Sequence, residues 1–200
     1  MAHGYTQEQE ILRETIRDFA LKAIAPYARE WDEKQEFPVE ILKQLGELGM
    51  MGAIVAPDYG GAGLGYPEYL VVVEELSRVD GSIALSVAAH NSLCVNHIDL
   101  IGNEDQKISY LKPLAGGQAL GAWALTEPDS GSDAAAARTR AVKENGSWIL
   151  NGTKSFCTHG RSADVYVILA VTDPEQGKHG LSAFIVEKNT EGLVPGKKEN

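Results

Sequence analysis

The chain has 200 residues, of which 44% are hydrophobic and 23% charged; this balance excludes intrinsic disorder and suffices for one large or two small domains with a core. Its 18 Lys and Arg residues stand against 28 Asp and Glu residues, and because no basic stripe offsets the net charge of −10, no nucleic-acid partner is expected. No apolar run approaches the ~18 residues of a membrane span, and the 2 cysteines are too few for a disulfide scaffold.

The first half of the chain carries the signals of helices. Thr6 and Gln9 have the spacing of a capping box at the start of the first one. Gly49 and Gly102 follow helical apolar patterns and are placed to end them, and Pro113 is expected to stop the last helix. The predicted helices cover residues 6–27, 38–48, 67–76, 82–101 and 104–111.

After a Gly-Gly pair at residues 116–117 the pattern changes to short segments rich in β-branched and aromatic residues, which is typical of strands. Asn145-Gly146 supplies a hairpin turn signal. The predicted strands cover residues 119–126, 139–143, 148–150, 165–171 and 181–186. We therefore predict an α+β, multidomain chain, with an all-α N-terminal domain over residues 1–115 and an antiparallel β-barrel middle domain over residues 116–200.

The sequence ALTEPDSGSD at residues 124–133 is the first segment that could carry chemistry. A strand is predicted to end at Thr126, and the proline and glycine that follow force an irregular loop. Successive backbone amides of such a loop can converge on an anionic or electron-rich ligand, and Ser130 and Ser132 add hydroxyl donors. A polar turn held by Asp and Ser side-chain hydrogen bonds explains the same residues equally well, so both interpretations stay open.

The sequence NGTKSFCTHG at residues 151–160 is the second such segment. A tight turn is predicted to lead into a strand in which Phe156 and Thr158 lie on the same face. The aromatic ring would stack on a planar heteroaromatic ligand while the hydroxyl bonds its edge. A core phenylalanine beside a surface threonine is the alternative.

Both segments resemble signatures of the acyl-CoA dehydrogenase family. ALTEPDSGSD matches every position of the family pattern: a small residue, an aliphatic residue, Ser or Thr, Glu, two variable positions, a small residue, Gly, Ser or Thr, and Asp. NGTKSFCT is similar to the family's second flavin-contacting strand, in which Trp is usual at Phe156 and Ile at Cys157. Further similarity lies in PDYGGAGLG at residues 57–65 and IGNEDQKISYL at residues 101–111, so the resemblance covers the whole chain in order.

The resemblance implies a flavoprotein oxidoreductase of fatty acid β-oxidation, with bound FAD, an acyl-CoA thioester substrate and an electron-transfer flavoprotein as electron acceptor. It implies that seven residues line the flavin, namely Trp123, Leu125, Thr126, Ser132, Phe156, Cys157 and Thr158. Ser132 would also lie near the CoA arm, and Thr126 with neighbouring amides would bond the pyrimidine edge of the ring. Phe156 in place of Trp loses ring area but keeps the stacking.

The implied reaction removes a proton from the carbon α to the thioester while a hydride leaves the β carbon for the flavin. It requires a carboxylate base, which in the family comes from a third, helical domain downstream. The resemblance makes Glu127 a structural residue, so no catalytic residue is assigned and the base is expected beyond Asn200. The family's C-terminal four-helix bundle is accordingly expected to be absent from this chain, the middle domain to be incomplete, and the segment of 200 residues to be inactive by itself.

Two other groups of polar residues receive no role in the reaction. Glu74 and Glu75 fall in an acidic helix and are expected to be solvated. His90, Cys94 and His97 recur at helical spacing as metal ligands do, but they lack a fourth ligand, so no metal is expected. Because the corresponding helix borders the substrate in the family, these three residues are instead expected to line the mouth of the acyl pocket.

Two other functions stay open. An acyl-CoA oxidase or a flavin monooxygenase on the same scaffold would reduce oxygen instead of an electron carrier. A non-catalytic, two-domain binding or assembly fragment would explain the missing base. The resemblance leans towards short-chain, butyryl-type members and towards a homo-oligomer, commonly a tetramer. The first residues resemble neither a secretory nor a transit segment, so the bacterial cytoplasm is expected, or the mitochondrial matrix for a processed form.

Overall fold

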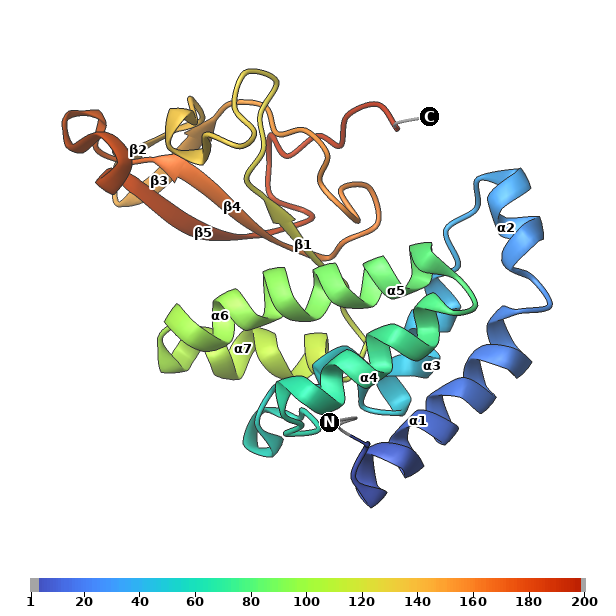
Figure 1. The fold of residues 1–200 in the computed structure, drawn as a ribbon. Helices are drawn as coiled ribbons and strands as arrows, with labels where there is room; N and C mark the ends of the chain where they lie inside the picture. The colour runs from blue at the N-terminus through green and yellow to red at the C-terminus, as the bar shows by residue number, and fades with distance from the viewer. Residues whose placement is uncertain (1–3, 199–200) are drawn as a thin grey trace. The chain divides into compact units, whose positions relative to one another are not determined.

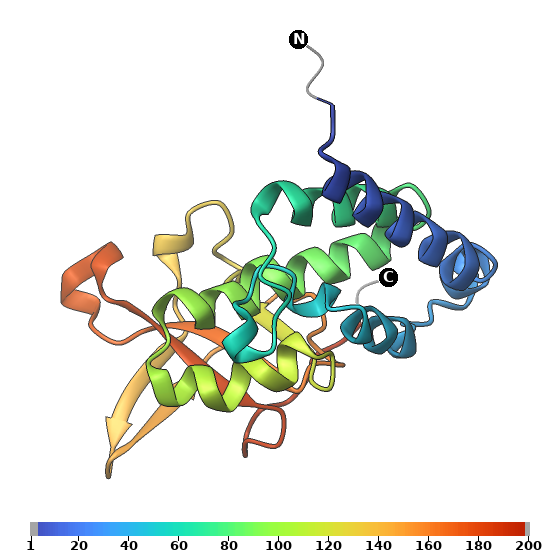
Figure 2. The same ribbon diagram turned by 90° about the horizontal axis from the view of Figure 1, so that it is seen from below.

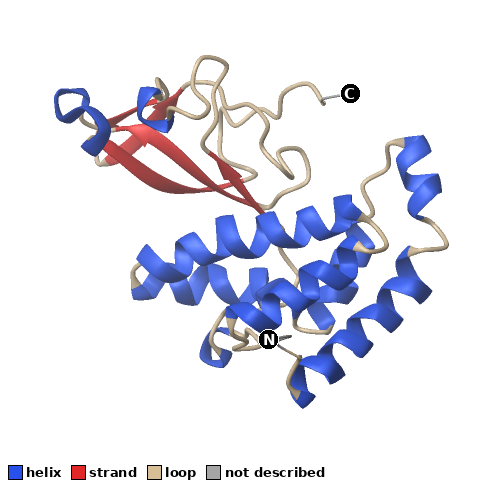
Figure 3. Cartoon of the chain, viewed as in Figure 1, coloured by secondary structure: helices blue, strands red, loops and turns tan. Residues whose placement is uncertain are grey.

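The computed structural model describes residues 4–198 and divides the chain into two compact units, Met1–Ala119 and Leu120–Asn200. The first unit is built of helices and the second around a sheet, as the colours of Figure 3 show. The division follows Ala119, whereas the sequence prediction places the boundary between residues 115 and 116.

The helical unit contains, within its described part, seven α-helices. They are α1 Gln7–Phe19, α2 Ala28–Lys34, α3 Val39–Glu47, α4 Tyr66–Ser77, α5 Gly81–Ala88, α6 Asn96–Ile101 and α7 Glu104–Ala115. Wider π-helical turns extend α1 over Ala20–Ile24 and join α5 to α6 over Ala89–Val95, and 3-10 turns lie at Met50–Gly52 and Pro57–Tyr59. Figures 1 and 2 show α5 and α6 as one continuous helical rod.

The start of α1 confirms the predicted capping box. The Gln9 N–H donates to the Thr6 hydroxyl oxygen at 3.2 Å, and the Thr6 N–H donates to the Gln9 side-chain oxygen at 3.0 Å. Ile16, Ala20 and Ile24 are fully buried at a spacing of four residues, as an amphipathic helix requires. The middle of the predicted apolar stripe therefore lies in the core.

The helix predicted over residues 82–101 is present as α5, the π turn and α6. Asn91 is fully buried in the π turn, and its amide group donates to the carbonyl oxygens of Val87 and Met50 at 3.1 and 2.9 Å. Its oxygen accepts the Ala53 N–H at 3.0 Å. A side chain that takes a carbonyl from the helical ladder is an identifiable cause of a widened turn. The same side chain ties the residues after α3 to the rod.

The predicted stop at Pro113 is wrong, because α7 continues through this residue to Ala115. A proline in the last turn removes one backbone donor, which leaves the carbonyl four residues earlier, that of Ser109, without its helical partner. Ser109 lies on the exposed side of α7, where water can serve that carbonyl. The loss is therefore small enough for the helix to run on.

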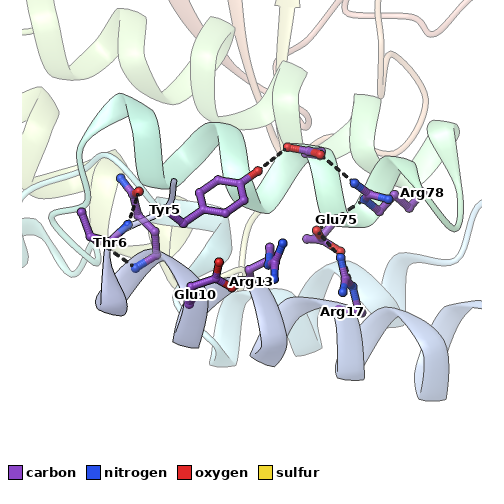
Figure 4. A network of polar contacts seen from close by, with 9 residues as sticks. Tyr5, Thr6, Glu10, Arg13, Arg17, Glu75 and Arg78 are labelled. Atoms are coloured by element: carbon purple, nitrogen blue, oxygen red, sulfur yellow. Dashed lines mark hydrogen bonds and ion pairs between the residues drawn. The ribbon is translucent and has the colours of Figure 1, made fainter. Parts of the chain in front are cut away.

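Glu75 of α4 corrects a second expectation, because it is buried and not solvated. Arg17 of α1 donates to its two carboxylate oxygens at 2.8 and 2.9 Å, and Arg78 lies 3.4 Å from the same group (Figure 4). Glu74 is exposed, as expected, and accepts hydrogen bonds from Arg78 and Tyr5 at 2.9 Å each. Helical spacing by itself could not reveal that α1 brings a cation to one of these two neighbours.

The backbones of the helical unit approach closely where α3 passes the end of α7. A Cβ atom at Gly46 would lie 2.5 Å from the carbonyl oxygen of Gly116, so only glycine fits there. None of the described helices has the length and apolarity needed to cross a membrane.

The second unit contains five strands within its described part. They are β1 Gly121–Ala124, β2 Arg140–Glu144, β3 Ser147–Asn151, β4 Val165–Val171 and β5 Leu181–Glu187. Short 3-10 turns lie at Ala134–Ala136 and Pro174–His179. The strands form one sheet in which successive pairings join β1 to β4, β4 to β2 and β2 to β3. In addition, β5 pairs along the whole length of β4.

The expected antiparallel barrel is wrong, because the described strands form an open, mixed sheet. β2 and β3 form the hairpin predicted from Asn145-Gly146, whose φ angles of 49° and 86° are left-handed as a tight hairpin turn requires. β4 and β5 are also antiparallel. β1, however, pairs with β4 in parallel, and β2 meets β4 in parallel at its Arg140 end. Turn signals indicate pairing only between strands that are adjacent in the sequence. The parallel pairings join strands that are far apart in the sequence, so they were not predicted.

Candidate functional site

The loop that leaves β1 is closed by a tight turn. Glu127 and Ser130 exchange backbone hydrogen bonds of 2.8 and 3.2 Å across Pro128 and Asp129. The Ser130 hydroxyl donates to the Asp133 carbonyl oxygen at 2.7 Å, so it stabilises the turn. For Ser130, the polar-turn interpretation is therefore the right one.

Glu127 is the buried centre of this loop. Its carboxylate accepts the backbone N–H groups of Arg138 and Thr139 at 2.6 and 2.9 Å and the Lys154 ammonium at 2.7 Å. Burial by itself would raise the pKa of Glu127, but these hydrogen bonds outweigh burial and lower it to about 2. An ionised carboxylate whose oxygens are occupied by three donors is a poor base, in agreement with the structural role expected for Glu127.

The segment around Phe156 runs antiparallel along the edge of β1 and its continuation. The Ser155 N–H donates to the Thr126 carbonyl oxygen at 2.8 Å. The remaining contacts are made by side chains that reach backbone carbonyls: Lys154 Nζ to Leu125 at 3.0 Å, Cys157 Sγ to Trp123 at 3.4 Å and His159 Nδ1 to Gly121 at 2.9 Å. These four contacts join the second signature segment to β1 and to the start of the first signature segment.

The strand expected to carry Phe156 and Thr158 on one face is absent, and this expectation is wrong. Phe156 and His159 have φ angles of 52° and 65°, which lie in the left-handed region that strands do not use. The Phe156 side chain is 77% exposed, whereas His159 is buried. Burial lowers the pKa of His159, and the contact with Gly121 opposes that shift. The predicted alternation of side chains between two faces requires an extended backbone, and the two left-handed residues interrupt it.

The seven residues assigned to the flavin differ in exposure. Five of them are half-buried along the joined segments: Trp123, Leu125, Thr126, Cys157 and Thr158. Phe156 and Ser132 are exposed. Burial raises the pKa of the Cys157 thiol, which keeps it protonated and disfavours a nucleophilic role. Whether these residues contact a flavin stays a prediction.

The chemistry of this donor set fits FAD. An exposed phenylalanine offers a ring face for stacking, and half-buried threonines and loop amides beside it offer donors to the polar edge of a planar ring. At Gly131 a Cβ atom would meet no other atom within 4 Å, so a ligand can approach this backbone closely. The arrangement can bind a ring, hold its edge and present it to a reactant.

His90, Cys94 and His97 do not form a metal site. Within residues 4–198, no three His, Cys, Asp or Glu side chains lie close enough together to hold an ion. His90 and Cys94 are fully buried, and His90 Nε2 lies 3.1 Å from the Leu114 carbonyl oxygen. Burial lowers the pKa of His97. The π turn at Ala89–Val95 also breaks the regular helical spacing on which the metal pattern depends.

Lys154 is the residue that sequence reasoning missed. Its side chain is only 10% exposed and bridges the Leu125 carbonyl and the Glu127 carboxylate. A signal was available, because a glutamate that is structural and buried needs a cation, and Lys154 is the lysine of the second signature segment. The pairing itself becomes visible only when the two segments are side by side.

Two models of protein families match the chain. The model described as acyl-CoA dehydrogenase, N-terminal domain, matches residues 6–118, and the model described as acyl-CoA dehydrogenase, middle domain, matches residues 122–200. An acyl-CoA dehydrogenase of Bacillus subtilis is 49% identical over 97% of this chain and 51% of its own length. A short-chain-specific acyl-CoA dehydrogenase of Clostridium acetobutylicum is 45% identical over 100% of this chain and 52% of its own length.

Solved structures share the fold. A chain from a structure of the electron transferring flavoprotein of Acidaminococcus fermentans has a TM-score of 0.93 and 42% identity, with 96% of this chain and 50% of that chain covered. Butyryl-CoA dehydrogenase of Megasphaera elsdenii has a TM-score of 0.91 and 40% identity, with 96% and 51% covered. An FAD complex of PigA has a TM-score of 0.90 and 32% identity, also with 96% and 51% covered.

The chain thus spans about half the length of the relatives that it matches. Together, the two family models cover nearly all of it, in the order in which its helical and sheet units occur. The chain belongs to the acyl-CoA dehydrogenase family, a family of enzymes.

Proposed function

We propose that this chain forms the flavin-facing part of an FAD-dependent dehydrogenase that converts a saturated acyl-CoA thioester to the trans-2-enoyl-CoA. The observation that carries the proposal is the joining of the two signature segments by contacts from Lys154 to His159 along β1. The FAD complex of a protein with the same fold supports the choice of cofactor. FAD, when bound, supplies the hydride acceptor for the substrate's β carbon.

The residues of the chain bind and orient the reactants in this proposal. Phe156 stacks on the flavin ring, and the Thr126 and Thr158 hydroxyls with nearby amides hold its polar edge. Ser132, on the exposed part of the loop, contacts the flavin and the CoA arm. Leu125 and Trp123 shape the wall behind the ring. Fixed donors aimed at the place where negative charge develops lower the barrier, because they need no reorganisation during the reaction.

No base for the α proton is assigned to the described residues. Glu127, the carboxylate of the signature loop, has a pKa of about 2 and is occupied by its donors. We therefore propose that the base comes from outside this chain, from a region that corresponds to the part of the relatives that the chain does not cover.

Three finer points belong to the same proposal. An electron-transfer flavoprotein takes up the electrons, which the similarity to a chain in a structure of such a flavoprotein supports. The protein acts as a homo-oligomer. It works in the bacterial cytoplasm, which the bacterial relatives support.

The test uses the protein expressed from its whole reading frame. We expect it to purify with visible flavin absorbance, and anaerobic butyryl-CoA to bleach that absorbance while enoyl-CoA forms. An electron-transfer flavoprotein should then restore the absorbance faster than air does. A protein that binds no FAD contradicts the proposal. Rapid reoxidation of the flavin by oxygen, with release of peroxide, would instead show that the protein is an oxidase.

A further inference from the structure

The Lys154 side chain lies where the two signature segments and the buried carboxylate meet. Its ammonium donates to the Leu125 carbonyl oxygen at 3.0 Å and to Glu127 Oε1 at 2.7 Å. Both partners belong to the loop that leaves β1, whereas Lys154 itself belongs to the segment that carries Phe156. With side chains only 10% and 6% exposed, Lys154 and Glu127 are shielded from solvent, so their field is weakly screened.

The Leu125 carbonyl and the Thr126 N–H are the two ends of a single peptide group. An ammonium that bonds the oxygen of a peptide draws electron density towards it and makes the N–H of the same peptide a stronger donor. The Thr126 N–H takes part in none of the backbone hydrogen bonds found in the loops of residues 4–198. Under the proposed function, this amide is one of the donors to the pyrimidine edge of the flavin.

We infer that Lys154 is a positioning residue that tunes the flavin through the Leu125–Thr126 peptide and favours reduced over oxidised FAD. The inference rests on the proposed function. Oxidised FAD that takes up a hydride, which is two electrons and one proton, gains one negative charge. A polarised N–H beside the ring therefore binds the reduced form more strongly than the oxidised form. Glu127 has the opposite effect, because its carboxylate partly neutralises the ammonium.

Two substitutions in the full-length holoenzyme separate this role from a purely structural one. Lys154→Met removes the ammonium and should weaken the binding of reduced relative to oxidised FAD about tenfold, which lowers the two-electron reduction potential by ~30 mV. Glu127→Gln releases the ammonium from its counter-ion and should shift the potential in the opposite direction. A residue that only holds the loop in place would move both potentials in the same direction or leave both unchanged.

Further variants keep the test decisive. Lys154→Arg retains the charge and should restore most of the wild-type potential. If Lys154→Met does not retain FAD, the double substitution Lys154→Met with Glu127→Gln removes both charges without leaving one unpaired, and its potential should still lie below that of the wild type. Arg17→Met is the control, because it also removes a cation from a buried carboxylate, Glu75 of the helical unit, and should leave the potential unchanged.

The measurement is an anaerobic titration of the bound flavin against a dye of known potential, together with the dissociation constant of oxidised FAD. Equal potentials in the wild type and Lys154→Met, with FAD bound in both, overturn the inference and leave the proposed function intact. A wild-type protein that binds no FAD overturns both.

Discussion

Among residues 4–198, each unit buries one carboxylate, and the two are held in different ways. In the helical unit, Glu75 is neutralised by arginine side chains, Arg17 from α1 and Arg78 from its own helix. Both arginines are partly exposed, at 40% and 56%. In the sheet unit, Glu127 is held by two backbone N–H groups and by Lys154, whose side chain is 10% exposed.

The kind of hydrogen-bond donor determines how rigidly each carboxylate holds the segments around it. Long arginine side chains on a helical surface can adjust, so Glu75 joins α1 to α4 in a contact that tolerates small movements (Figure 4). Backbone donors cannot adjust without moving the chain. Glu127 therefore fixes three stretches of backbone relative to one another, at its own loop, at residues 138–139 and at Lys154. A binding site that needs a fixed geometry is better served by the second arrangement.

The largest effect is expected where a carboxylate loses the one cationic side chain that pairs with it within residues 4–198. Lys154→Met leaves Glu127 buried and unpaired, so it should lower the free energy of unfolding by about 3–5 kcal/mol. Arg17→Met should have a smaller effect, because Arg78 remains within 3.4 Å of Glu75. Urea unfolding of the two variants and the wild type measures the difference. Equal losses would show that the two carboxylates are held alike.

The pH dependence of stability should separate the carboxylates next. Burial would raise the pKa of Glu127, but the hydrogen bonds prevail and lower it from 4.5 to about 2. Because the unfolded chain then binds the proton more tightly, this stabilisation is complete above ~pH 5.5 and is lost as the pH falls through 4.5 towards 2. At ~1.4 kcal/mol per pKa unit it amounts to about 3 kcal/mol.

Unfolding free energies between neutral and acidic pH test this expectation in the wild type and in Glu127→Gln. The difference between the two curves should shrink as the pH falls, since the variant has no carboxyl group to protonate. Parallel curves would show that Glu127 is not held in its ionised form.

A third prediction separates contact with the ligand from support of the loop. Phe156 is 77% exposed, so Phe156→Ala should change the free energy of unfolding by no more than ~0.5 kcal/mol. Loss of stacking worth about 0.5–1.5 kcal/mol should weaken FAD binding up to roughly tenfold. Flavin fluorescence quenching measures the affinity. Trp148→Ala on β3 removes another exposed aromatic side chain as the control, and an equal loss of affinity in both variants would remove Phe156 from the flavin site.

The smallest effect is expected at Arg138, whose backbone and side chain do different things. Its N–H donates to Glu127, whereas its guanidinium forms an exposed ion pair with Asp129. Arg138→Ala keeps the N–H and removes only the surface pair, so it should lower the free energy of unfolding by less than ~1 kcal/mol. A loss as large as that of Lys154→Met in the same urea experiment would show that the guanidinium, and not the backbone, holds the loop.

Local signals accounted for the elements that depend on nearby residues. The Thr6–Gln9 capping box and the Asn145-Gly146 hairpin turn depend on partners three residues apart or closer, and both are confirmed. The prediction at Pro113 was wrong although it used a local rule of the same kind. A proline in a helix leaves one backbone carbonyl without its N–H donor, and the energetic cost depends on whether water can reach that carbonyl.

The sequence identified the two segments of the candidate site but not the contacts that bring them together. Both signature segments carry the resemblance in their own residues, so Glu127 and Phe156 could be singled out. The parallel pairing of β1 with β4 and the role of Lys154 depend on residues tens of positions apart, and the left-handed backbone of Phe156 has no signal in its residue type. No pattern of neighbours contains that information.

The sequence by itself determined the family, the order of the helical and sheet units and the two signature segments, because these depend on local periodicity and contiguous motifs. Only the tertiary structure decided that Glu75 is buried, that the sheet is open and mixed, and that Lys154 joins the segments through Glu127. The physical reason is burial: a charge withdrawn from water is stable only beside a partner, and the fold brings that partner from a distant part of the chain.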